Sequence, residues 1–253
     1  MTSSNAWGWS HILLFLGWCV ALGGTTALDT LGSQAYTGGS QKTDLSIHFQ
    51  RAVLILWILL IPVCALWCFI EPVLLWLSQP PLIARDSQTF LRILCVGAPG
   101  YFGFESLKKY LQCQGKEEIL AVRILPLTWS LGIMGASTSI LLVVSPINIA
   151  LNVYMVHFTP LGLFGSPLAI SITYWLCFTG LGIWTYLSPT HKCNGTWGGI
   201  QIRAVLNAPS CYQFLKLALP GILMVGTEWL ILFSLQIKYT FNRFFFNKGL
   251  HLR

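Results

Sequence analysis

The chain has 253 residues, of which 55% are hydrophobic and only 9% charged. Soluble domains carry about a quarter charged residues, so this composition excludes an ordinary soluble protein and indicates an integral membrane protein. The formal net charge is +7, but four basic residues lie in the last sixteen positions and the others are spread over loops, so we expect no nucleic-acid surface.

Six apolar runs are long enough to cross a bilayer as helices, which takes about 20 residues. In chain order the runs are 11–30, 52–77, 90–112, 133–156, 161–187 and 214–237. Only "HFTP" separates the fourth run from the fifth, which predicts a tight helical hairpin. The expected fold is therefore all-α, a polytopic membrane protein with about six transmembrane helices.

Lys and Arg residues gather in the first, third and fifth connections between these runs. By the positive-inside rule these connections face the cytoplasm, and the N-terminus faces the opposite side. The basic tail after residue 237 then falls on the outer side, where the rule fails. The sequon Asn194-Gly195-Thr196 lies in the fifth connection, so we expect it to be unused.

Glu228 lies near the middle of the apolar stretch "LPGILMVGTEWLILFSL", and the nearest upstream basic residue is Lys216. Ionisable groups inside a membrane are costly and mark functional sites by default. Burial without a cationic partner disfavours the charged form, so such a carboxyl group can take up and release a proton near physiological pH. The alternative is a neutral acid that is hydrogen-bonded to a neighbouring helix.

For each of the remaining acids, a structural role is an alternative to a functional one. Asp29, in "TTALDTLGSQAY", is either a cation or proton site, or it is a helix N-cap at a break or an interfacial acid. Glu105 is followed three and four residues later by Lys108 and Lys109, so we expect an ion pair within one helix. Glu71 precedes Pro72 near the end of its run and is expected at the interface.

A glycine-proline cluster, Gly97, Pro99, Gly100 and Gly103, precedes Glu105. Such residues bend membrane helices or let two helices approach closely, and broken helices often line transport sites. The eight cysteines form no CxxC pair and are expected to pack as small hydrophobic residues, without disulfides. The five histidines share no ligand spacing, so we expect neither a metal site nor catalytic residues.

The pieces "ALDTLGSQAY", "APGYFGFESLKKYLQCQG", "SPLAISITYW" and "FLKLALPGILMVGTEW" resemble eukaryotic members of the multidrug and toxic compound extrusion (MATE) family. Their order matches the second to seventh helices of that family over residues 11–229. The resemblance implies a multi-pass antiporter of the plasma or vacuolar membrane that exports organic cations and other xenobiotics in exchange for protons. It implies no cofactor, and the residues leave Na⁺ open as an alternative coupling ion. Two six-helix lobes would rock about a central cavity.

The resemblance also implies roles for particular residues. Glu228 falls on the acidic position of the seventh helix that is implicated in proton and substrate-cation binding, and Asp29 falls on the acid of the second-helix motif. Polar motif positions without an assigned role are matched by Gln34, Tyr110, Gln112 and Gln114. We group Gln112 with Gly97, Pro99 and Gly100 as candidates for a cavity or a helix break.

The chain departs from the family pattern in several places. The first helix and the eighth to twelfth helices have no counterpart, and Phe233 replaces a second acid. Residues 115–132 are predicted to be a non-family insertion, and residues 230–253 are predicted to be a non-family basic tail. For both segments the hypothesis is that a retained intron encodes them. The alternative function is therefore a truncated fragment that is inactive alone or associates with a full-length relative. A membrane-embedded enzyme is the third class, and the scattered histidines argue against it.

Overall fold

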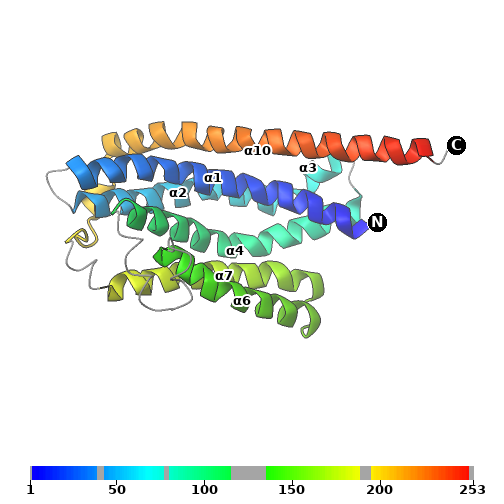
Figure 1. Ribbon diagram of the computed structural model, residues 1–253, viewed down its shortest axis with the longest axis horizontal. Helices are drawn as coiled ribbons and strands as arrows, with labels where there is room; N and C mark the ends of the chain where they lie inside the picture. Colours follow the sequence, from blue (N-terminus) through cyan, green and yellow to red (C-terminus); the bar gives the residue numbers. More distant parts are fainter. Residues whose placement is uncertain (1, 39–42, 77–79, 115–134, 189–194, 251–253) are drawn as a thin grey trace.

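The computed structural model describes residues 2–38, 43–76, 80–114, 135–188 and 195–250. Within these ranges the side chains of residues 2–14, 16, 163, 230 and 232–250 are not described. In the described residues, six long helices run back and forth along one axis (Figure 1). They are α1 (Thr2–Gly38), α2 (Asp44–Cys68), α4 (Pro81–Gln112), α6 (Ala136–His157), α7 (Gly165–Leu187) and α10 (Ala208–Leu250).

Three short helical segments of the same part of the chain lie in the connections: α3 (Glu71–Trp76), the 3-10 turn η3 (Gly162–Phe164) and α9 (Ile202–Val205). The all-helical prediction is confirmed, and each apolar run predicted from the sequence lies in a long helix or reaches into one. Among the described residues, α2, α6, α7 and α10 up to Trp229 are long and apolar enough to cross a membrane.

The predicted hairpin between the fourth and fifth runs is present as α6 and α7. Gly162 has a φ of +51°, in the left-handed region that favours glycine, and it begins the single turn η3 that reverses the chain. The side-chain amide of Asn148 donates to the Thr173 hydroxyl across the pair at 2.7 Å. The two helices are therefore joined by a polar contact as well as by a short connection.

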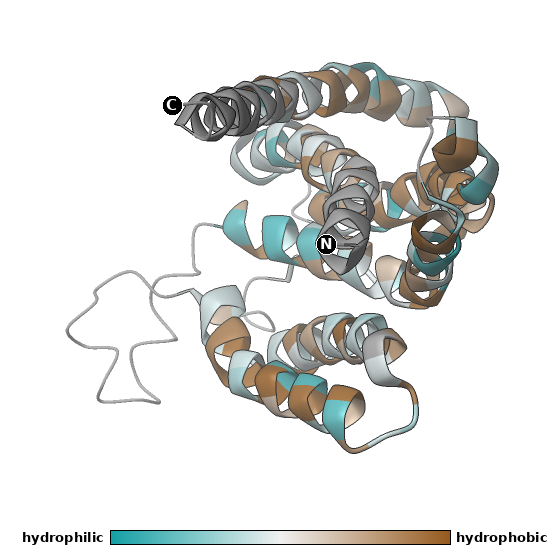
Figure 2. Cartoon of the chain, turned by 90° about the vertical axis from the view of Figure 1, so that its right-hand side faces the viewer, coloured by the Kyte–Doolittle hydropathy of each residue, from teal (hydrophilic) through white to brown (hydrophobic). Residues whose placement is uncertain are grey.

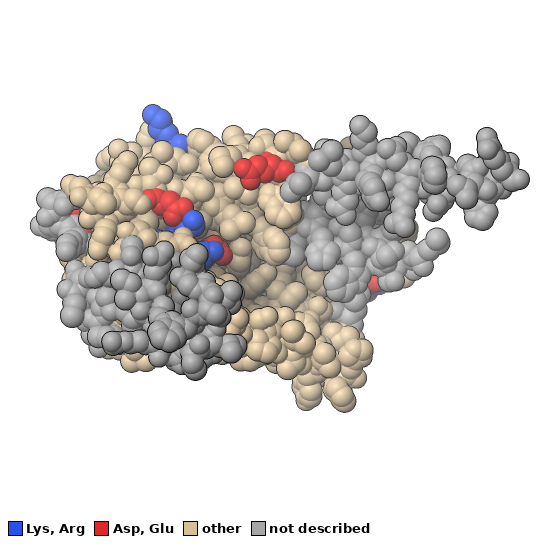
Figure 3. All heavy atoms as spheres, viewed as in Figure 1, with Lys and Arg blue, Asp and Glu red and all other residues tan. Residues whose placement is uncertain are grey.

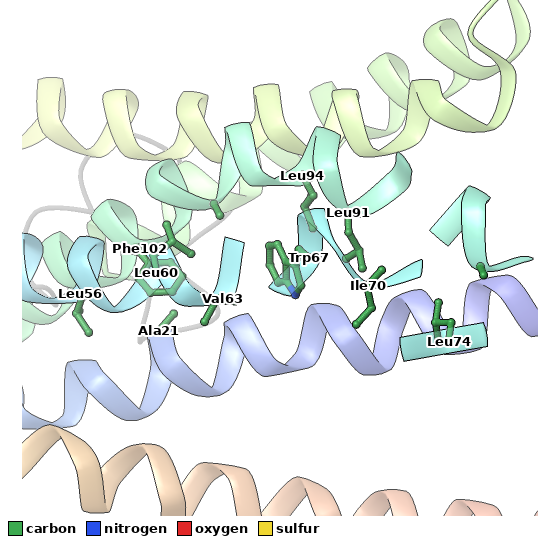
Figure 4. Packing of buried hydrophobic residues seen from close by; sticks show 12 residues of the cluster. Ala21, Leu56, Leu60, Val63, Trp67, Ile70, Leu74, Leu91, Leu94 and Phe102 are labelled. Atoms are coloured by element: carbon green, nitrogen blue, oxygen red, sulfur yellow. The ribbon is translucent and has the colours of Figure 1, made fainter. Parts of the chain in front are cut away.

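Apolar side chains fill the space between α1, α2, α3 and α4. Trp67 is 2% exposed and lies beside Ile70, Leu91 and Leu94 (Figure 4). Apolar residues make up much of the helices (Figure 2), and many of their side chains are exposed on the outside, among them Ile61, Val96 and Ile183. On α6 only 11% of the candidate span is buried. An apolar helix with so little protein around it needs lipid as its solvent.

Glycines at three-residue spacing bring α4 and α7 into backbone contact. A Cβ added at Gly97 would lie 2.5 Å from the Cα of Ser171, and one at Gly103 would lie 2.8 Å from the Phe178 ring. The Trp175 indole N–H donates to the carbonyl of Val96 at 2.9 Å across the same interface. Small residues at such positions are what packing between membrane helices requires.

The predicted helix break in this cluster is wrong. The helix α4 runs without interruption through Gly97, Pro99 and Gly100, and the carbonyl of Pro99 accepts a hydrogen bond from the Trp57 indole at 3.2 Å. Neighbouring helices therefore stabilise α4 around its proline, as membrane helices permit. The cluster therefore does not break the helix, and its glycines provide close packing against α7.

A second glycine contact joins α1 to α10. A Cβ added at Gly221 would lie 2.5 Å from the carbonyl oxygen of Gly23. Farther along, the rings of Phe15 and Trp229 have centroids 4.6 Å apart. These two contacts fix an antiparallel register, in which residue numbers rise along α10 as they fall along α1.

Replacing Gly97 by alanine should destabilise the fold, because the new methyl group meets the backbone of α7 and forces α4 and α7 apart. Overpacking of this kind costs about 1–3 kcal/mol. Gly182 is the matched control, since nothing lies within 4 Å of a Cβ placed there. Gly182→Ala should be neutral or slightly stabilising. Thermal unfolding in detergent micelles measures both, and equal melting temperatures for the two variants would contradict the close packing.

Candidate functional site

Glu228 lies on α10 with an exposed side chain. Within the described part of the chain it makes no ion pair and no hydrogen bond, so the alternative of a bond to a neighbouring helix is not observed. Next to it, Trp229 contacts Phe15 of α1, and the Thr227 hydroxyl donates to the carbonyl of Met224 at 2.8 Å. No described side chain therefore occupies the carboxylate oxygens, which can accept a proton or contact a cation.

Asp29 lies within α1 and not at its end, because the helix continues to Gly38. The interpretation of Asp29 as a helix cap at a break is therefore wrong. Its carboxylate accepts a hydrogen bond from the Lys109 ammonium of α4 at 2.7 Å, and its side chain is 39% exposed. The thiol of Cys113 packs near the carbonyls of Leu28 and Asp29, where burial raises its pKa above the ordinary value.

Glu105 pairs with Lys108, three residues on, at 2.6 Å, as predicted for an ion pair within one helix. We predicted that Lys109 would also pair with Glu105, and that part of the prediction is wrong. The side chain of Lys109 crosses to α1 and pairs with Asp29. Two consecutive lysines therefore have different partners, one on their own helix and one on the neighbour.

The structure does not bring Asp29 and Glu228 together. In the antiparallel register of α1 and α10, Trp229 lies level with Phe15, so Glu228 lies level with the residues that follow Phe15. At 1.5 Å per residue, Asp29 is then about 20 Å away along the helix axis. The face drawn in Figure 3 shows acidic and basic atoms in contact toward one end of the bundle, and most of the other described surface on this face is uncharged.

The remaining candidates share no hydrogen bond or ion pair with either acid in the described part of the chain, although Gln112 follows Lys109 by one turn of α4 and is next to Cys113, which lies near Asp29. Gly97 and Gly100 are buried against α7, and Gln112 is exposed at the end of α4. Gln34 is exposed on α1, whereas the side chain of Phe233 lies outside the described part of the chain.

A cavity of about 530 Å³ lies between α2, α4, α7 and the segment after residue 194. Aromatic rings dominate its lining, which includes Phe49, Tyr110, Phe178, Tyr186 and Trp197. The candidate cavity residues Gly97, Pro99, Gly100 and Gln112 are not among those that line it. Their role in a cavity therefore stays a prediction.

The segment after residue 194, which lines the cavity and leads to α10, is hydrogen-bonded to α2 and α4. The Tyr110 hydroxyl bonds to the Thr196 hydroxyl at 3.2 Å, and Gln50 bonds to the backbone of Gly199 and Gln201. Thr196 is fully buried, whereas the acceptor Asn194 lies outside the described residues, so the expectation that the sequon is unused stays a prediction.

Arg51 is the residue that sequence reasoning missed. Its position in the sequence suggests only a loop charge, yet it is 4% exposed and donates to the carbonyls of Ala204 and Val205 at 2.7 and 3.2 Å. These carbonyls end the short helix α9, where a cation is favoured. The only sequence signal is the position of Arg51 directly before an apolar run. The carbonyls that it binds lie about 150 residues on and carry no side-chain signature.

Arg51→Met should loosen this connection, because two carbonyls lose a charged donor, and such bonds are worth about 1.5–3 kcal/mol. Hydrogen exchange of the peptide 196–206 should become faster. Arg203→Met is the matched control, since Arg203 lies on α9 with an exposed side chain. Unchanged exchange in Arg51→Met would show that the guanidinium does not hold the connection.

The Asp29–Lys109 pair predicts a measurable coupling. In a double-mutant cycle with Asp29→Asn and Lys109→Met, the two changes should be non-additive by about 0.5–1 kcal/mol, the range for partly exposed pairs. The cycle for Asp29 with Lys108→Met serves as the control and should be additive. Unfolding free energies in micelles provide the readout, and strict additivity of the first cycle would disprove the pair.

Comparisons with known proteins agree with this geometry. A family model described as MatE matches residues 8–138. The "Uncharacterized transporter C323.07c" of Schizosaccharomyces pombe is 32% identical over 206 residues, which are 81% of this chain and 34% of that protein. "Multidrug and toxin extrusion protein 1" of Danio rerio is 30% identical over 217 residues, 84% of this chain and 32% of that protein.

A solved structure shows the same arrangement of helices. The crystal structure of the eukaryotic MATE transporter AtDTX14 superposes with a TM-score of 0.70 at 25% identity, over 87% of this chain and 45% of that one. The chain therefore spans between a third and a half of the length of these proteins.

Proposed function

The chain belongs to the MATE family, and from that premise we propose that it takes part in exporting organic cations or other xenobiotics across a membrane in exchange for protons. It is a multi-pass membrane protein and not an enzyme. Because it spans about a third of the S. pombe transporter, the activity of whole family members comes to it only as a proposal.

The proposal rests on the surroundings of Glu228. It is a carboxylate on an apolar helix, and no cationic side chain in the described residues is paired with it. The same two oxygens can hold a proton or face an organic cation, so occupancy by one disfavours the other. Proton uptake can then release the cation, which is the exchange that an antiporter needs.

Asp29 is less suited to this role in the observed arrangement. Its partner Lys109, at 2.7 Å, already neutralises its charge. An approaching organic cation would have to displace that ammonium. We therefore assign proton and cation binding to Glu228 and a helix-fastening role to Asp29.

The names of similar proteins support the same substrate class. Relatives are called multidrug and toxin extrusion proteins in Danio rerio and Mus musculus, and DETOXIFICATION proteins in Arabidopsis thaliana. We extend drug and toxin extrusion to this chain, at the plasma or vacuolar membrane. We keep H⁺ as the coupling ion, because a lone carboxylate offers few of the oxygen ligands that a bound metal ion requires.

Residues 115–132 and 230–253 remain proposed as segments outside the family pattern. The first lies outside the described residues, and α10 continues as a helix to Leu250 through most of the second. Sequencing of the mature transcript tests both segments. We expect it to lack the codons for 115–132 and to diverge after Trp229, and a transcript identical to the present chain would refute the intron hypothesis.

Expression in a host that lacks its own drug exporters tests the function. The chain should raise resistance to a toxic organic cation, and Glu228→Gln should abolish the gain, because an amide cannot exchange a proton or carry the charge. Asp86→Asn is the control, an acid on α4 that should leave resistance unchanged. Good membrane expression without any resistance would favour the alternative of a fragment that does not transport alone.

A further inference from the structure

Three cysteines from two helices lie together, and we call them the thiol trio. Cys64 and Cys68 are one helical turn apart at the end of α2, and Cys95 lies opposite them on α4. The Cys95 sulfur is 3.9 Å from the carbonyl oxygen of Cys64, and Arg92, one turn before Cys95 on α4, bonds to the carbonyl of Cys68, so this turn of α4 faces both cysteines of α2. All three are partly exposed and free.

Polar groups next to the thiol trio place it near the outer rim of the bundle. Cys68 is the last residue of α2, and the exposed Arg92 donates to its carbonyl at 3.0 and 2.8 Å. Glu71 follows at the start of α3 and bonds to Gln88. By the positive-inside rule this rim faces away from the cytoplasm, toward compartments in which disulfides form and persist.

Hydrophobic packing accounts for the thiol trio only in part, since Cys64 and Cys95 pack against the core cluster around Trp67 while staying partly exposed. No group of metal-ligating side chains with the arrangement of a metal site occurs among the described residues. Packing as small hydrophobic residues accounts for Cys19 and Cys177, which are buried and have no thiol in contact within the same part of the chain. It does not explain why Cys64 and Cys95, both partly exposed, meet across two helices.

We propose that Cys64 and Cys95 form a disulfide that fastens α2 to α4 in an oxidising compartment, with Cys68 as the neighbouring exchange thiol. The oxidant is a small disulfide such as oxidised glutathione. The Cys64 thiolate attacks one of its sulfurs, which breaks the S–S bond and releases one small thiol. The Cys95 thiolate then attacks the Cys64 sulfur of the mixed disulfide and releases the second. Two protein S–H bonds become one S–S bond, and the two electrons and two protons leave in the two small thiols.

The disulfide would stabilise the helix pair without obstructing the proposed exchange. Both cysteines lie in helices that contact the core cluster around Trp67. Glu228 and the contact of Gly23 with Gly221 lie on α10 and α1, outside the linked pair. A bridge between α2 and α4 therefore restricts the unfolded chain and leaves α10 unconstrained.

The full chain in detergent micelles, incubated with oxidised glutathione and then quenched with acid and alkylated, tests this proposal. Mass spectrometry of the peptides should show Cys64 linked to Cys95, with Cys19 and Cys177 still alkylated after unfolding. The link should be lost in Cys95→Ser and retained in the control Cys211→Ser. The melting temperature of the native chain should rise on oxidation, and that of folded Cys95→Ser should not.

Three results would overturn the disulfide. The first is that both thiols of the folded chain stay free in excess oxidised glutathione. The second is that Cys95 links only to Cys68, which would make Cys64 a bystander. The third is an equal yield of the Cys64–Cys95 link in chain unfolded with detergent, because the pairing would then not depend on the fold. Transport is not measured in any of these experiments, so they stand apart from the test of Glu228.

Discussion

Close contact between helix backbones, possible only where a glycine lacks a side chain, holds this bundle in its arrangement. Membrane helices gain little from the hydrophobic effect on meeting each other, so van der Waals packing and polar contacts must hold them. Gly97 provides such contact between α4 and α7, and Gly23 with Gly221 provides it between α1 and α10. The second contact decides the depth of every residue on α10, including Glu228.

The depth of Glu228 in the bundle separates it from Asp29, although both acids lie in apolar runs of the sequence. Asp29 and Glu228 both lie in apolar helices, but the register of α1 and α10 keeps them about 20 Å apart along the axis. Asp29 is close to α4 and pairs with Lys109, whereas Glu228 has no cation paired with it in the described residues. These different surroundings are the basis on which we propose a fastening role for Asp29 and an exchange role for Glu228.

Apolar runs predicted the helices well, since each run needs the length of a bilayer and little else. The glycine-proline cluster was ambiguous, because the same small residues allow a bend or a close approach, and only the positions of Ser171 and Phe178 on α7 decide between them. Lys109 and Arg51 were misjudged for a related reason. Their partners lie on other elements, and for Arg51 they are backbone carbonyls that no residue pattern reveals.

The most direct test of the account is uptake of a labelled organic cation into proteoliposomes under an imposed pH gradient, with Glu228→Gln compared to Asp29→Asn. The account predicts that Glu228→Gln abolishes gradient-driven uptake, while Asp29→Asn keeps it and lowers only the melting temperature. Loss of uptake in a folded Asp29→Asn variant, with uptake retained in Glu228→Gln, would contradict the assignment of the exchange to Glu228.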